Sequence, residues 1–133
     1  MITWNAVYSV HIPEIDQQHR KLLALLGELE SSMNSGRGGD MLGHTIDQMV
    51  EYTEYHFKTE ERLMATHAYP RTEAHLAQHQ EFKERSLQLR QQYAAGQRAI
   101  SIHTLTFLCE WLLYHILSTD LELGSFLRDK DVM

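Results

Sequence analysis

The sequence predicts an all-α protein: an up-down-up-down antiparallel four-helix bundle with an extended N-terminal arm. In four separate segments, apolar residues recur at steps of three and four, which is typical of a helix that buries one face. The breaks between these segments are short, which favours antiparallel neighbours. The 133 residues include only seven glycines and two prolines, a composition that suits a helix-rich protein.

The first helix is expected to begin at Pro13, because proline is favoured in the first turn of a helix. It ends before the glycine-rich break at 35–40. The second helix then runs from Asp40 to about position 67, and Pro70 prevents its continuation because proline disfavours helix in the residue before it.

The third helix is expected to begin near Thr72 and to stop near Gly96, where glycine can cap a helix C-terminus. The fourth begins after Ser101. Residues 1–12 have no helical period and predict an extended arm packed on the outside of the bundle. We therefore expect one domain over residues 1–133, with the bundle at 13–133 and no internal repeat.

Composition excludes several classes of function. The formal net charge is −6 with both signs interleaved, which argues against nucleic acid as a partner. Cys109 is the single cysteine, so no disulfide can form within the chain. The most apolar stretch, 104–117, is too short and too polar to span a bilayer, and the N-terminus lacks the pattern of a signal peptide. We expect a cytoplasmic monomer without membrane insertion.

Six ionisable residues interrupt the apolar faces of the four helices. Burial of such groups is costly unless they are paired or bind a metal. A single one of them would most simply be a hydrogen-bonded core histidine, but six in one bundle favour a metal site. Two pairs are four residues apart and so lie on one helix face. The six residues are His19, His56, Glu60, His75, His79 and His115.

Asp120 is a seventh candidate ligand on the fourth helix. It lies five residues after His115, whereas a regular helix would place Thr119 on the same face. A single wide turn, a π-bulge, would bring both His115 and Asp120 inward. The alternative is a frayed helix end that leaves Asp120 in solvent.

The size of this ligand set indicates two metal ions. Five imidazoles and two carboxylates are too many for one tetrahedral zinc. Two six-coordinate ions need about twelve bonds, and these groups together with a solvent-derived bridge supply all but one of them. Imidazole with carboxylate suits iron. Counting leaves open iron or manganese, and reversible O2 binding or oxidation.

These residues also match a known pattern. The stretch from His56 to Phe82 resembles the hemerythrin pattern H-F-x-x-E-E, followed by Y-P and H-x-x-x-H. The flanking segments IDQQHRKL and WLLYHILSTD, and Trp4 before them, are similar to the same family. The likeness covers nearly the whole chain and points to the bacterial single-domain members.

The resemblance implies a role for each candidate residue. One iron would be held by His75, His79 and His115, and the other, which keeps an open position, by His19 and His56. Two carboxylates, Glu60 and Asp120, would bridge two iron ions that also share an oxo or hydroxo group. The wall of an apolar O2 pocket would consist of Leu22, Phe57, Trp111, Leu112 and Ile116.

The function implied is reversible binding of dioxygen for storage, transport or delivery, without enzymatic turnover, and an O2-consuming enzyme is a candidate recipient. A di-iron oxidase or peroxidase is one alternative. The carboxylate-rich sites of that class use Glu-x-x-His motifs, which this chain lacks. An O2 sensor that acts through a separate partner protein is the other alternative.

Overall fold

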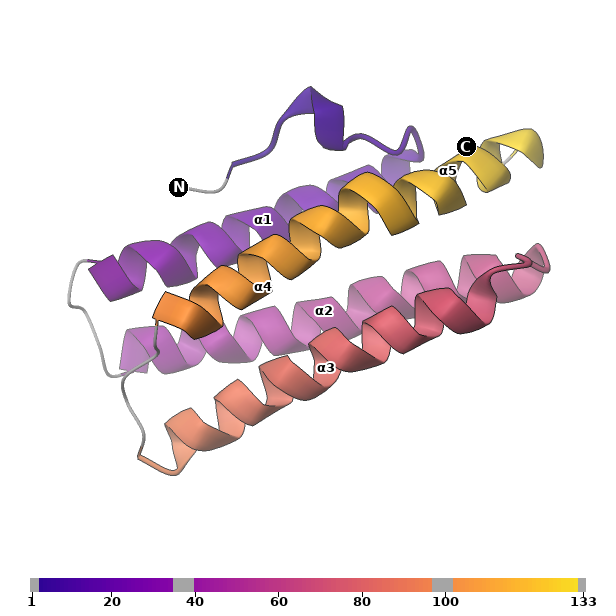
Figure 1. The fold of residues 1–133 in the computed structure, drawn as a ribbon. Coiled ribbons are helices and arrows are strands. Elements are labelled where there is room, and N and C mark those ends of the chain that lie inside the picture. The colour runs from indigo at the N-terminus through magenta and orange to yellow at the C-terminus, as the bar shows by residue number, and fades with distance from the viewer. Residues whose placement is uncertain (1–2, 35–39, 97–101, 132–133) are drawn as a thin grey trace.

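The computed structural model describes residues 3–34, 40–96 and 102–131, and its helices are arranged up-down-up-down (Figure 1). The first three are α1 (Pro13–Asn34), α2 (Asp40–Thr66) and α3 (Thr72–Ala94). The fourth consists of α4 (Ile102–Tyr114), the π-helical turn η2 (His115–Asp120) and α5 (Leu121–Asp129). The breaks expected at 35–40 and after Gly96 fall largely on 35–39 and 97–101, which lie outside the described residues.

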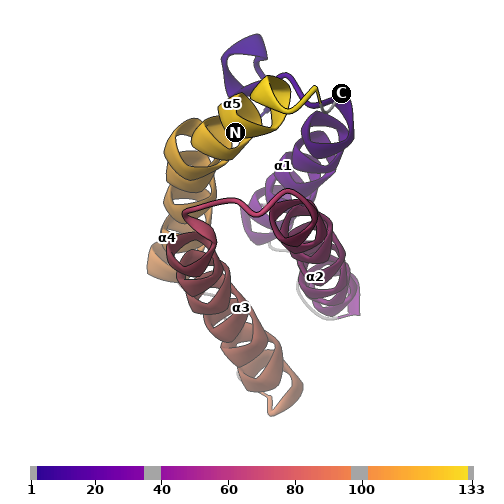
Figure 2. The same cartoon turned by 90° about the vertical axis from the view of Figure 1, so that its right-hand side faces the viewer.

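The helices form a closed ring, seen end-on in Figure 2. Helix α1 packs on α2, α2 on α3, and α4 contacts both α3 and α1. The predicted all-α, antiparallel four-helix bundle is therefore confirmed, and α1 and α3 begin at the residues expected. No helix in the described part of the chain offers an apolar stretch long enough to cross a membrane.

A tight turn joins α2 to α3. Ala68 adopts a positive φ of 52°, and the Tyr69 amide donates to the Met64 carbonyl over 3.0 Å, which closes the end of α2. The Thr72 hydroxyl donates to the Tyr69 carbonyl over 2.6 Å where α3 begins. Because the turn is short, the two helices lie antiparallel, and residues on both sides of it can meet in the core.

The N-terminal arm lies across α1 and the fourth helix, as both views show (Figures 1 and 2). It is not extended throughout, because Ala6–Tyr8 form one 3-10 turn, η1. The Asp16 carboxylate accepts hydrogen bonds from the Ser9 hydroxyl and from the Val10 amide at 2.8 Å. These bonds tie the arm to the first turn of α1.

The interior contains two apolar clusters with a polar layer between them. The larger cluster includes Leu22, Phe57 and Ile116, and the smaller one, beneath the arm, includes Ile15 and Leu123. Along α1, α2 and the fourth helix the candidate ligands fall between members of the two clusters, and those of α3 fall between Tyr69 in the preceding turn and Phe82. The polar layer is therefore sealed on both sides by hydrocarbon.

Candidate metal centre

The structure brings all seven predicted ligands together in this polar layer. Each has at most 3% of its surface exposed, although all seven are ionisable. Burial of this kind requires partners, because an isolated charge in an apolar interior is strongly destabilising. The seven are His19 from α1, His56 and Glu60 from α2, His75 and His79 from α3, and His115 and Asp120 from η2.

Their ligand atoms form two groups, and within each group the atoms lie within 4.8 Å of one another. One group contains the histidines of α3 and η2, and the other contains those of α1 and α2. Glu60 and Asp120 belong to both groups. Such a grouping can provide two adjacent ion sites that share both carboxylates.

Glu60 turns one oxygen toward each group. Its Oε1 lies 3.0 Å from His75 Nε2 and 2.9 Å from His79 Nε2. Its Oε2 lies 3.2 Å from His56 Nε2. The two oxygens of one carboxylate therefore face different histidine groups.

Asp120 also directs one carboxylate oxygen toward each histidine group. Its Oδ1 lies 3.1 Å from His75 Nε2 and 3.0 Å from His115 Nε2, whereas its Oδ2 lies 2.8 Å from His19 Nε2. All five histidines thus present Nε2 to the centre, and both carboxylates lie between the groups.

Hydrogen bonding accounts for only part of this arrangement, the contacts of Glu60 Oε1 with His75 and His79. Several of the other ligand atoms lie at hydrogen-bond distance from one another without hydrogen-bond geometry, so they are buried without a partner. Two ligands at a right angle around a metal with bonds of about 2.1 Å lie about 3 Å apart, which matches the distances seen. The atoms fit metal ions, and they include His19 Nε2, His56 Nε2, Glu60 Oε2, His115 Nε2 and both carboxylate oxygens of Asp120.

Electrostatics agree with a site for cations. Burial disfavours the charged carboxylate of Glu60, but the surrounding imidazoles outweigh burial and hold its pKa well below the usual range. The pKa of Asp120 is lowered too, against burial, by His115 and His19. Burial disfavours the charged form of His19, yet Asp120 and Glu60 raise its pKa to about 9. For His56 burial prevails and lowers the pKa.

The predicted wide turn in the fourth helix is present. Residues His115–Asp120 form the π-helix η2, and both ends of it are fully buried. The extra residue in this turn lets Asp120 face inward five positions after His115. The frayed-end alternative for Asp120 is therefore wrong.

The five predicted pocket-wall residues lie in the larger cluster or against it. Leu22, Leu112 and Ile116 are each at most 2% exposed. Phe57 stacks on His79, with ring centroids 3.8 Å apart, and Trp111 stacks on His115 at 4.6 Å. The side of the metal centre toward this cluster is therefore apolar and aromatic.

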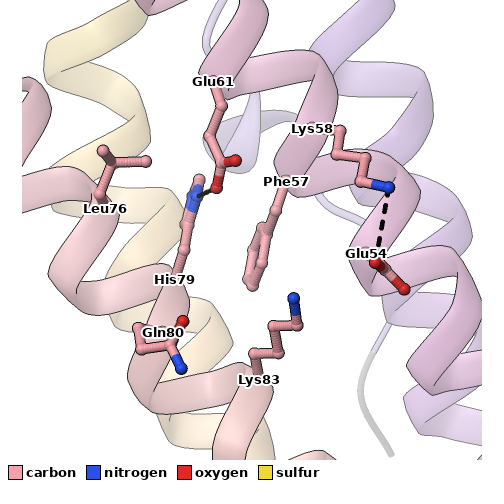
Figure 3. A pocket seen from close by; sticks show the side chains of 8 residues that line it. All are labelled: Glu54, Phe57, Lys58, Glu61, Leu76, His79, Gln80 and Lys83. Atoms are coloured by element: carbon pink, nitrogen blue, oxygen red, sulfur yellow. Dashed lines mark hydrogen bonds and ion pairs between the residues drawn. The ribbon is translucent and has the colours of Figure 1, made fainter.

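A surface cavity of about 280 Å³ reaches this wall between α2 and α3 (Figure 3). The rings of Phe57 and His79 line it side by side, and the Glu61 carboxylate points at His79. The distance from Glu61 Oε2 to His79 Nδ1 is 3.0 Å. The remaining lining residues are Glu54, Lys58, Leu76, Gln80 and Lys83.

The sequence did not reveal which groups hold the outer nitrogens of the histidines. Two tyrosines that directly precede ligand histidines in the sequence, Tyr55 and Tyr114, are 57% and 68% exposed. The structure places Glu61, Gln18 and Gln78 against three of the five outer nitrogens, those of His79, His56 and His115 respectively. Each of the three directly neighbours a candidate ligand in the sequence, which is the only signal that could have indicated them.

Comparison with known proteins agrees with this centre. The family model of the hemerythrin HHE cation binding domain matches residues 10–127. A bacteriohemerythrin of Stenotrophomonas maltophilia is 35% identical over 120 residues, which are 90% of this chain and 77% of that protein. One of Methylococcus capsulatus is 27% identical over 128 residues, 96% of this chain and 97% of its own. A crystal structure of wild-type hemerythrin aligns with a TM-score of 0.83 at 26% identity, covering 94% of this chain and 96% of its own. This chain belongs to the hemerythrin family.

Proposed function

We propose that this chain is a di-iron O2-binding protein and that the seven buried residues are the iron ligands. The histidines at positions 75, 79 and 115 would hold one iron, and those at 19 and 56 would hold the other. Glu60 and Asp120 would serve both ions. The second ion would have two histidines where the first has three, which would leave room for O2. The observation that supports this assignment best is the split of each carboxylate, one oxygen toward each histidine group.

The protein supplies the surroundings that reversible O2 binding needs. When bound, an iron pair supplies the two electrons on which O2 binding in this family depends. The chain supplies imidazoles whose buried Nε2 atoms face the centre, and carboxylates whose depressed pKa keeps them anionic. The apolar wall formed by Leu112, Ile116 and their neighbours excludes water from the open position.

We propose that the chain does not turn over a substrate. Its centre has five imidazoles for two carboxylates, unlike the carboxylate-rich centres of di-iron oxidases. Oxygen storage, transport or delivery then requires that bound O2 be released unchanged. An oxidase would instead consume O2 in proportion to an added reductant, and a peroxidase would consume hydrogen peroxide.

The test is iron analysis of the purified full chain together with its visible spectrum under cycles of air and vacuum. We expect about two irons per chain and a spectrum that returns to its starting form when O2 is removed. One-way conversion to a ferric form with continued O2 uptake would support the oxidase. A chain that folds without binding iron would overturn the proposal.

We further propose a single domain that works as a cytoplasmic monomer. The unpaired thiol of Cys109 suits a reducing compartment. Sedimentation of the iron-loaded chain and fractionation of cells that express it test these two points. Pull-down with and without O2 tests the sensor alternative, since a sensor should gain or lose a partner protein with the change.

A further inference from the structure

Two glutamines hold the outer nitrogens of histidines on neighbouring helices. Gln18 of α1 places Oε1 2.7 Å from Nδ1 of His56 on α2. Gln78 of α3 places Oε1 2.7 Å from Nδ1 of His115 at the start of η2. Each contact crosses from one helix to the next, so it fixes a candidate ligand to a different helix from its own.

Each glutamine also contacts a threonine. The Gln18 amide donates to Thr59 Oγ1 over 3.1 Å. The Thr119 hydroxyl donates to Gln78 Oε1 over 2.8 Å. The contacted threonines directly precede Glu60 and Asp120, the two carboxylates shared by the histidine groups. One glutamine side chain therefore touches both a histidine and the backbone neighbour of a bridging acid.

The two halves of the bundle repeat this arrangement. One helix carries Gln-His, as Gln18–His19 or Gln78–His79, and the next carries a histidine followed by Thr and an acid. In α2 the histidine and acid are four residues apart, and in the fourth helix they are five apart. The π turn η2 accommodates the extra residue. No internal repeat was expected from the sequence, and the spacing of histidine and acid does differ by this one residue between the halves.

Between α1 and α2, the hydrogen bonds of Gln18 and Thr59 determine which ring nitrogen of His56 carries the proton. The Thr59 hydroxyl donates to the Tyr55 carbonyl over 3.3 Å, so its oxygen accepts from Gln18. The amide nitrogen of Gln18 must then face Thr59, and its oxygen faces His56. An oxygen accepts only, so His56 is protonated at Nδ1 and its Nε2 lone pair points to the centre.

We infer that Gln18 and Gln78 are positioning residues of the iron centre, each fixing the tautomer and orientation of one ligand histidine through a neutral acceptor. This inference rests on the proposed function. A group that accepts from the outer nitrogen of a metal-bound imidazole controls its basicity. The carboxylate of Glu61 does this with a negative charge at His79, whereas the two amides do so without one.

Two substitutions of Gln78, one that adds a charge to the acceptor and one that removes the acceptor, distinguish control of the iron reduction potential from a simple packing role. Gln78→Glu keeps an acceptor of the same length and adds a negative charge, so the His115 imidazole becomes a stronger electron donor to the iron. We expect the reduction potential of the iron pair to fall. Gln78→Leu removes the acceptor, so the potential should rise and iron affinity should fall about ten- to hundred-fold. Gln78 is only partly buried, so both variants should fold.

The experiment measures iron affinity by chelator competition and reduction potential by spectroscopic titration of the full chain. Gln91→Glu and Gln91→Leu are matched controls, because Gln91 is exposed on the same helix and lines neither the metal centre nor the cavity beside it. We expect both controls to retain the parental potential. Shifts of the same sign in the two Gln78 variants, or none, would overturn the inference, because a purely structural role does not reverse with the charge of the acceptor.

Substitutions of Thr119, whose hydroxyl donates to Gln78, provide a second measurement. Thr119→Ser retains the donor to Gln78 and should keep the parental potential, whereas Thr119→Val should move it in the direction of Gln78→Leu. A parental chain that holds no iron pair would reject the proposed function itself. A parental chain with two irons whose potential ignores Gln78 and Thr119 would reject only the positioning role.

Discussion

The ring of Phe57 lies flat against the imidazole of His79, with centroids 3.8 Å apart and planes inclined by 6°. Both rings line the cavity between α2 and α3. Phe57 also belongs to the apolar cluster that covers the metal centre. It therefore stands between a water-accessible hollow and the apolar interior.

Phe57→Ala should open this boundary. We expect a loss of about 3–5 kcal/mol in the free energy of unfolding, because a buried aromatic side chain leaves a cavity. Autoxidation should accelerate, since water can enter from the surface cavity. Tyr55→Ala, at a 57% exposed position of the same helix, is the control and should change neither quantity. Parental autoxidation in Phe57→Ala would contradict the boundary role.

Leu112→Ala tests a second residue of the pocket wall. Leu112 is 1% exposed, so its truncation should lower the free energy of unfolding by about 2–5 kcal/mol. The space left beside the metal centre should admit water and speed autoxidation, measured as decay of the oxygenated spectrum. Leu121→Ala, at a 40% exposed position, should have little effect. A stable Leu112→Ala protein with an unchanged decay rate would remove Leu112 from the pocket.

Glu60→Ala should lower iron content and thermal stability together. The substitution removes an acid that faces both histidine groups and leaves the buried imidazoles with Asp120 as the one remaining carboxylate shared by both groups. We expect fewer than two irons per chain by metal analysis and a lower Tm; His56→Ala should act in the same direction. Glu51→Ala, exposed on the same helix, should retain iron. Full iron loading in Glu60→Ala would refute the bridging assignment.

Gly124→Ala should detach the N-terminal arm. A Cβ at this position would lie 2.5 Å from the Val10 carbonyl oxygen, which is closer than atoms can approach. Because the contact is with backbone, the arm must move, and we expect a loss of about 1–3 kcal/mol. Hydrogen exchange at the Val10 amide should increase. Ser125→Ala, exposed next to it, should leave both stability and exchange unchanged.

Much of the metal centre could be predicted from local spacing. The side-chain positions of a helix repeat every 3.6 residues, so an ionisable residue in an apolar seam must face the core wherever the helix packs. This reasoning identified the residues at the centre, including Asp120, whose five-residue offset from His115 required the wide turn that is present. The likeness to hemerythrin then implied two irons.

Periodicity along a single helix could not predict the contacts between helices. Gln18, Gln78 and Glu61 lie beside the seams, and nothing in their own periodicity indicates which histidine they meet. Their partners depend on the rotation and axial register of neighbouring helices, which follow from how all the core side chains pack together. The same packing decided which carboxylate oxygen faces which histidine, and it placed Val10 against Gly124 where an extended arm alone had been expected. Periodicity along one helix determines the face of a residue, whereas a contact between two helices is a property of the assembled core.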